Sequence, residues 1–123
     1  MYELTIETDF SSAHNLRGYE GACENLHGHN WRVEVSIAAA RLDALGMVMD
    51  FKKLKAAAKA VIDRLDHAYL NEVPPFDKEN PTAENISRHI YQDLAASIND
   101  DNVAVSKVRV WESATSSATY HED

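Results

Sequence analysis

The amino-acid sequence predicts an α+β domain in which two helices cover one face of an antiparallel four-stranded sheet. Four segments alternate apolar and polar residues with a period of two, as half-buried strands do. Two segments between the second and third of these strands repeat apolar residues at helical spacing. The element order is therefore strand, strand, helix, helix, strand, strand. Residues 1–123 contain no linker, low-complexity tract or strong internal repeat, so we expect a single domain.

The first two strands place three histidines in one phase. Residues 2–10 alternate, and His14 lies in phase with their apolar face if the strand continues. The second strand is expected over residues 27–40, with His27 and His29 in phase with its apolar face. Consecutive strands joined by a loop are usually antiparallel neighbours. We therefore expect the three imidazoles to meet at the loop end of this strand pair.

Three neutral imidazoles are ligands that suit zinc, and they leave a fourth position open for water or substrate. The competing interpretation of His27 and His29 is a pair of surface histidines, because an H-x-H pattern alone is common. Cys23 is the only cysteine and lies four residues before His27. It either lines the same pocket or acts as a small buried apolar residue.

The two helices have recognisable starts and buried stripes. Asp50 is a candidate N-cap for a helix that ends near residues 66–67. Asn80 or Thr82 caps the second helix, and Pro81 suits its first turn. The apolar stripe of the second helix consists of Ile86, Ile90, Leu94 and Ile98.

Two further strands complete the predicted sheet. The third is expected from Val103 to Glu112, with Glu112 on the same face as Val108 and Val110. The last is expected over residues 118–121. The other face of the sheet carries mixed charges and small residues, so it needs either water or another subunit.

Several charged or polar residues have a structural interpretation, and most of them also have a functional one. Asp66 and His67 at a helix end are either a dipole-favoured histidine with a solvated neighbour, or a proton shuttle with its orienting carboxylate. Glu112 is either a charge at the strand end or a pocket carboxylate that accepts two hydrogen bonds. Thr82 is most simply a helix cap, and Arg17 either contacts an anion or is exposed.

The composition excludes several partners. A net charge of −8 and a pI near 5.1 argue against nucleic acid as an electrostatic partner. A single cysteine excludes an intrachain disulfide and fits a reducing compartment. The start of the chain lacks signal-peptide features, and its apolar runs are too short for a membrane span. We therefore expect a cytoplasmic protein without membrane association.

With these residues described, the chain resembles the 6-pyruvoyl-tetrahydropterin synthase family, and within it the 6-carboxy-tetrahydropterin synthases of queuosine biosynthesis. The matching motifs follow one order along nearly the whole length. They are FSSAH at 10–14, CxxxHGH at 23–29, GMVMDF at 46–51, LDH at 65–67 with LN at 70–71, PTxEN at 81–85 and VWE at 110–112. The spacing between Cys23 and His27 is similar to that of the queuosine branch.

The resemblance implies a zinc ion bound by His14, His27 and His29. It also implies that Cys23 acts as a catalytic base or a nucleophile-like thiolate, assisted by Asp66 and His67.

The substrate-binding residues implied by the resemblance are Glu112 and Thr82. Glu112 would anchor the aminopyrimidinone edge of a pterin, with Thr82 as a nearby contact.

The implied architecture is the tunnelling fold, in which trimers close a barrel and stack as homohexamers with active sites between subunits. The implied reaction converts 7,8-dihydroneopterin triphosphate to 6-carboxy-5,6,7,8-tetrahydropterin, with release of triphosphate and acetaldehyde. Two alternatives remain at this point. One is a 6-pyruvoyl-tetrahydropterin synthase, which eliminates triphosphate only. The other is a non-catalytic module that binds zinc or a pterin.

Overall fold

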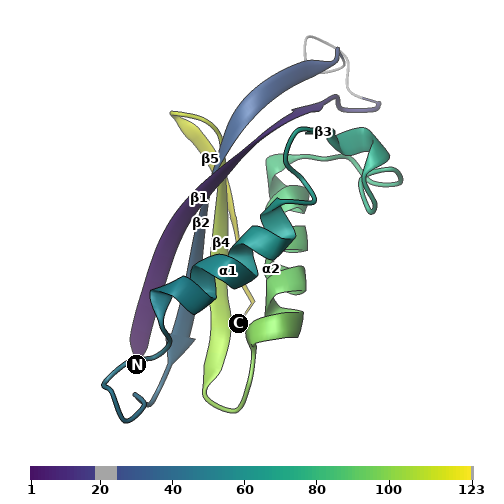
Figure 1. Ribbon diagram of the computed structural model, residues 1–123. Coiled ribbons are helices and arrows are strands. Elements are labelled where there is room, and N and C mark those ends of the chain that lie inside the picture. The colour runs from purple at the N-terminus through teal and green to yellow at the C-terminus, as the bar shows by residue number, and fades with distance from the viewer. Residues whose placement is uncertain (19–24, 123) are drawn as a thin grey trace.

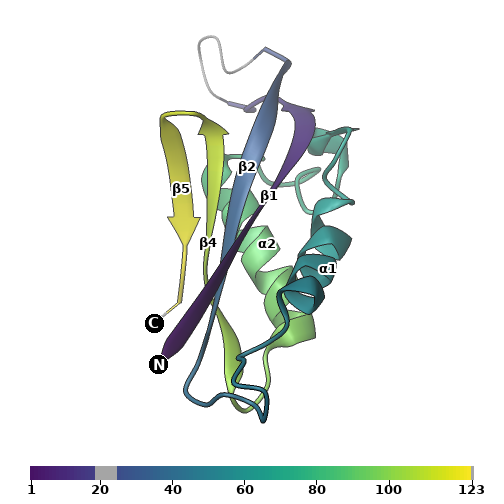
Figure 2. The same cartoon turned by 60° about the vertical axis from the view of Figure 1, so that its left-hand side comes forward.

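A computed structural model describes residues 1–18 and 25–122. It contains a five-stranded sheet of order β3-β1-β2-β4-β5, with both long helices on the same side (Figures 1 and 2). In chain order the elements are β1 Tyr2–His14, β2 His27–Ala39, α1 Phe51–Ile62, β3 Ala68–Tyr69, a 3₁₀ turn Leu70–Glu72, α2 Ala83–Ile98, β4 Val103–Ser113 and β5 Ser116–Tyr120. The predicted α+β class with two helices on one sheet face is confirmed.

The antiparallel pair of β1 and β2 contains the two longest strands of the sheet. Its antiparallel register runs without a shift from the Tyr2–Ala39 pair to the His14–His27 pair. Phe10 and Trp31 face each other across this pair with their rings stacked at a centroid distance of 5.9 Å. Because side chains alternate along both strands, this register places the histidines on the same face as the two aromatic rings.

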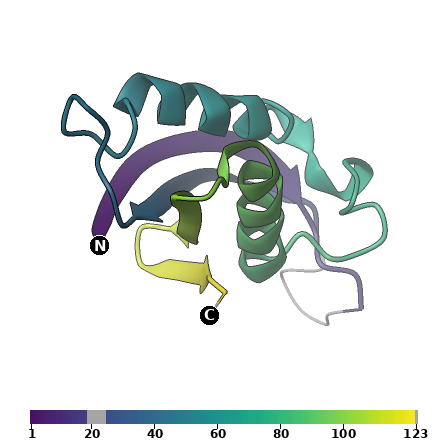
Figure 3. The same cartoon turned by 90° about the horizontal axis from the view of Figure 1, so that it is seen from below.

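The core lies between this face and the helices, and Figure 3 shows α2 inside the curve of the sheet. The expected stripe of α2 is buried, as are the inward valines of β2 and β4. Burying each such aliphatic side chain contributes about 1.5–3 kcal/mol. The side chain of Asp50 accepts the amide of Lys52 at 2.8 Å, which confirms it as the cap of α1. No helix in the described ranges is long and apolar enough to span a bilayer.

The segment after α1 differs from the expected course. The helix ends at Ile62 rather than near residues 66–67, and residues 63–67 form turns. His67 has a positive φ of 52°, and its amide donates to the carbonyl of Ser11 at 2.7 Å. This turn carries the chain into β3, which pairs in parallel with Ser12 and Ala13. The sheet therefore has a short fifth strand, so it is mostly rather than wholly antiparallel.

Two features of the sheet remain uncovered in the described chain. The outer edge of β1 has a strand partner only at Ser12 and Ala13, so residues 2–10 form an open edge among the described elements. The sheet face opposite the helices is charged. On it the guanidinium carbons of Arg32 and Arg109 lie 4.4 and 5.8 Å from the centre of the Trp111 ring.

Candidate metal centre

Three imidazoles meet where β1 ends and β2 begins, as their shared phase predicts. The ring centroids of His14 and His27 are 4.5 Å apart, those of His14 and His29 are 5.0 Å apart, and those of His27 and His29 are 4.7 Å apart. The ring of Trp31 packs edge-on against His14 and His29, at 4.9 and 5.0 Å. The indole and the strand register together hold the three rings as a compact group.

Backbone carbonyls fix the tautomers of two of these rings. Nδ1 of His14 lies 2.8 Å from the carbonyl oxygen of Pro81, and Nδ1 of His27 lies 2.7 Å from that of Asn25. A carbonyl only accepts, so each Nδ1 carries the proton and each neutral ring presents a lone pair at Nε2. The Nε2 atoms of His14 and His27 are 3.0 Å apart. Two facing lone pairs repel, and a cation bound between them removes that repulsion.

The electrostatics of the centre favour neutral rings. Burial lowers the pKa of His14 below the ordinary value of 6.5, and the neighbouring histidines lower it further against the opposing effects of Pro81 and Glu112. Burial also lowers the pKa of His29, although Glu112 acts in the opposite direction. A metal binds the neutral imidazole, so these shifts prepare the centre for a cation rather than for protons.

Glu112 joins the histidine group from β4. Its Oε1 lies 3.2 Å from Nε2 of His29 and 3.9 Å from Nε2 of His14. The ligand atoms of the three histidines and Glu112 all lie within 4.8 Å of one another, so this group could hold a metal ion. Nε2 of His29 is buried and has no hydrogen-bond partner, because the nearby carboxylate oxygen does not meet hydrogen-bond geometry. An orphaned nitrogen beside two lone pairs and a carboxylate fits a metal centre.

Asp66 and His67 form a separate pair at the outer edge of β1. Oδ1 of Asp66 accepts the amide of Ser11 at 2.9 Å and lies 3.0 Å from Nδ1 of His67. The Ser11 hydrogen bond and the contact with His67 lower the pKa of Asp66. The side chain of His67 is 84% exposed. In the described ranges no hydrogen bond or ion pair joins this pair to the histidine group.

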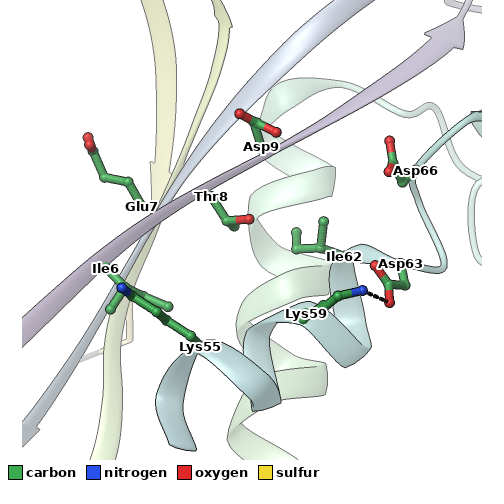
Figure 4. A pocket seen from close by; sticks show the side chains of 9 residues that line it. All are labelled: Ile6, Glu7, Thr8, Asp9, Lys55, Lys59, Ile62, Asp63 and Asp66. Carbon is green, nitrogen blue, oxygen red and sulfur yellow. Dashed lines mark hydrogen bonds and ion pairs between the residues drawn. The ribbon is translucent and has the colours of Figure 1, made fainter. Parts of the chain in front are cut away.

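Asp66 also borders a cleft of about 440 Å³ between β1 and α1, shown in Figure 4. The charged groups that line it are four carboxylates and two lysines, Glu7, Asp9, Asp63, Asp66, Lys55 and Lys59. Lys59 is already paired with Asp63 at 2.6 Å. This excess of negative charge does not favour an anionic ligand in the cleft.

Thr82 and Arg17 have structural partners. The hydroxyl of Thr82 accepts the amide of Asn85 at 3.1 Å, so Thr82 rather than Asn80 is the N-cap of α2. The guanidinium of Arg17 donates to the carbonyl oxygens of Phe76 and Glu79, both at 2.8 Å. Arg17 therefore ties two loops together within the chain.

Sequence reasoning missed the two carbonyls that orient the metal-facing rings, those of Asn25 and Pro81. A backbone acceptor leaves no residue-type signal, although the conspicuous PTxEN segment does contain Pro81. Cys23 lies outside the described residues, so its role stays a prediction.

The chain is similar to known proteins over nearly its whole length. The family model of 6-pyruvoyl tetrahydropterin synthase matches residues 3–123. The 6-carboxy-5,6,7,8-tetrahydropterin synthase of Haemophilus influenzae is 32% identical over an alignment 149 positions long. This alignment covers 99% of this chain and 100% of that protein. The enzyme of the same name from Synechocystis is 38% identical over 126 residues, covering 98% and 93%.

Among solved structures, that of 6-pyruvoyl tetrahydropterin synthase from Caenorhabditis elegans superimposes with a TM-score of 0.83 at 28% identity. The match covers 100% of this chain and 98% of that one. Taken with the family model and the relatives, it identifies the chain as a member of the 6-pyruvoyl tetrahydropterin synthase family.

Proposed function

We propose that this protein is a zinc-dependent 6-carboxy-5,6,7,8-tetrahydropterin synthase of the queuosine pathway. Its substrate is 7,8-dihydroneopterin triphosphate, which reacts with water to give 6-carboxy-tetrahydropterin, triphosphate and acetaldehyde. The observation that carries the proposal is the group of three histidines with Nε2 atoms that lack protein hydrogen-bond donors. The names of the relatives that match over most of the chain support the choice of product.

The three histidines would hold the zinc ion. Zinc bound there supplies Lewis-acid stabilisation of negative charge on a substrate oxygen. The protein supplies the rigidity that this chemistry needs, because carbonyls fix the rings of His14 and His27 and an indole packs on His29.

Cys23 and the pair formed by Asp66 and His67 transfer the protons in this proposal. As a thiolate, Cys23 takes or relays the carbon-bound proton. Oδ1 of Asp66 lies 3.0 Å from Nδ1 of His67 and orients the imidazole for the exchange of a second proton.

His67 reaches the metal centre from a neighbouring subunit in this proposal. The exposed ring of His67 has no link to the histidine group within the described chain. The open edge of β1 and the uncovered sheet face suit self-association, and we propose a hexamer built as a dimer of trimers. The enzyme acts in the cytoplasm, which fits its single cysteine.

Glu112 anchors the pterin in this proposal. A carboxylate can accept two hydrogen bonds from the aminopyrimidinone edge, and Glu112 borders a cleft of about 280 Å³ beside the metal centre. The start of α2 forms one wall of this cleft through Ala83 and Glu84. Thr82 directly precedes that wall and is the proposed nearby contact.

A product assay tests the function directly. Zinc-loaded protein is incubated with 7,8-dihydroneopterin triphosphate, and acetaldehyde, triphosphate and the pterin product are quantified together. Equal amounts of acetaldehyde and triphosphate support the proposal, with chelator-treated protein as the inactive control. Triphosphate without acetaldehyde would assign the 6-pyruvoyl reaction instead. Release of neither compound, with zinc and pterin bound, would leave a binding module.

A further inference from the structure

The metal centre lies at the end of the β1–β2 ladder, where strand pairing stops. His14 is the last residue of β1 and pairs with His27, the first residue of β2. Backbone groups beyond the end of a ladder need other hydrogen-bond partners, or the end of the strand frays. Such fraying would move the ring of His14 relative to the other two imidazoles, so the partners of the next residues matter for the centre.

Two asparagine side chains provide these partners. Oδ1 of Asn71 accepts the amide of Asn15 at 3.0 Å, and Nδ2 of Asn71 donates to the carbonyl of the same residue at 2.9 Å. Asn80 makes the same two bonds with the backbone of Arg17, each at 3.0 Å. A side-chain amide carries both a donor and an acceptor, as a peptide group does. Each asparagine therefore takes the place of the paired residue on an antiparallel strand and fixes the backbone beyond His14.

The two asparagines act on opposite sides of the hydrogen bond that orients the ring of His14. Asn71 is buried and holds the backbone directly after His14, which is the donor side of this bond. The acceptor is the carbonyl of Pro81, the residue that follows Asn80. Because Asn80 pairs with the backbone of Arg17, the acceptor carbonyl is tied to the same segment that carries the donor ring.

We propose that Asn71 and Asn80 are positioning residues of the metal centre, which hold the ring of His14 and the carbonyl of Pro81 in their relative places. The inference rests on the zinc site of the proposed function but not on its reaction. Each asparagine acts through the backbone beside the His14–Pro81 hydrogen bond rather than as a ligand. Loss of an outer partner of a metal ligand typically lowers metal affinity by about 10–100-fold, and these residues lie one step further out, so we expect about tenfold for each.

A third asparagine pair of the same kind provides the matched control. Oδ1 of Asn102 accepts the amide of Arg41 at 3.0 Å, and its Nδ2 donates to the carbonyl of Arg41 at 2.9 Å. This pair joins the chain after β2 to the start of β4, at the end of β2 opposite His27. Asn102→Ala therefore removes the same two hydrogen bonds without touching either side of the His14–Pro81 bond.

The test compares Asn71→Ala, Asn80→Ala and Asn102→Ala in the complete protein. Chelator competition measures the zinc dissociation constant, and urea unfolding of the metal-free proteins measures the stability that each variant loses. We expect the first two variants to raise the zinc dissociation constant about tenfold, and Asn102→Ala to leave it at the wild-type value. Since all three lose an equivalent pair of bonds, a general loss of stability would not produce this difference.

A second measurement needs no metal. The Nδ1 proton of His14, bonded to the carbonyl of Pro81 at 2.8 Å, should give an imidazole N–H signal in the proton–nitrogen NMR spectrum of metal-free wild type. Asn80→Ala should weaken this signal through faster exchange with water, and Asn102→Ala should keep it. Asn80→Asp replaces the alanine variant if that one does not fold, because the carboxylate has the same shape and loses only the donated bond.

Unchanged zinc affinity and an unchanged imidazole signal in the folded Asn71 and Asn80 variants would overturn the inference. Equal losses in Asn102→Ala would overturn it too, because they would assign the effect to general stability. If wild type binds no zinc, the proposed zinc site fails, and the signal in metal-free protein still decides whether Asn80 positions the ring. These readings are independent of turnover, which the product assay measures separately.

Discussion

The two ring nitrogens of His14 have different tasks, and the sequence predicts only one of them. The phase of residues 10–14 predicts that the ring joins His27 and His29, because the alternation of apolar and polar residues shows which side chains share a strand face. The proton at Nδ1 is directed by the carbonyl of Pro81, 67 residues further along the chain. That contact depends on where the start of α2 packs, and a local pattern does not contain this information.

The role of Cys23 is a prediction at the same scale. In the proposed centre three imidazoles suffice to hold zinc without the thiol, so Cys23→Ala should retain zinc and bind pterin. Turnover should fall by roughly 10²–10⁴-fold, the usual contribution of a positioned general base. Metal analysis, pterin binding and the product assay on one preparation check all three expectations. Activity within a few-fold of wild type would make Cys23 a packing residue, and loss of zinc would make it a ligand.

Among the elements, the sequence predicts those with a long regular pattern and misses those set by tertiary pairing. The strands β1 and β2 and the helix α2 match their expected ranges closely, because many residues repeat each period. The predicted end of α1 was wrong because Leu65 continues the apolar spacing of the helix in the sequence. In the structure Leu65 belongs to the turn after the helix, and its side chain is buried there. The strand β3 has only two residues, too few to show alternation.

His89 of α2 makes a pH-dependent contribution to the free energy of unfolding. His89 on this helix packs edge-on against Phe76 at 5.4 Å, and burial lowers its pKa below 6.5 despite the nearby Asp93. As the pH falls below 6.5, the unfolded chain binds this proton before the folded chain does, so the free energy of unfolding decreases. Above 6.5 both states are neutral at His89, and its contribution no longer changes with pH.

His89→Gln should therefore lose less stability on acidification than wild type. Urea unfolding of both proteins, freed of metal by a chelator, measures the difference across this pH range. The metal-free state keeps the three clustered histidines equivalent in the two proteins. Parallel curves of unfolding free energy against pH would show that His89 takes up its proton equally in both states.

The whole molecule has more sheet surface than one chain covers. The outer edge of β1 is open over residues 2–10, and β5 forms the other edge of the sheet. Open edges of this length invite pairing with another strand. They are compatible with the proposal that a neighbouring subunit completes the active site.

Complementation between two inactive variants checks this arrangement. His29→Ala should remove the metal centre of its own subunit, and His67→Ala the proton relay that it lends to its neighbour. Co-expression of the two variants should restore up to about a quarter of wild-type activity. In a random assembly of equal amounts, about half of the subunits carry an intact metal centre, and about half of their neighbours carry an intact His67. Each variant alone, at the same oligomer size, is the control. A mixture as inactive as its parts would place the whole site within one chain.

The hydrogen bond from His14 to Pro81 makes the start of α2 a reporter of metal loading. The acceptor carbonyl immediately precedes the Thr82 cap, which receives the amides of Asn85 and Ile86. Adding zinc to metal-free protein should therefore slow deuterium uptake at these two amides. The amide of Asn99, bonded to Ala95 at the far end of α2, should exchange at an unchanged rate. Equal slowing along the entire helix would mean global stabilisation instead. Occupancy of the centre then becomes measurable by mass spectrometry, with no substrate present.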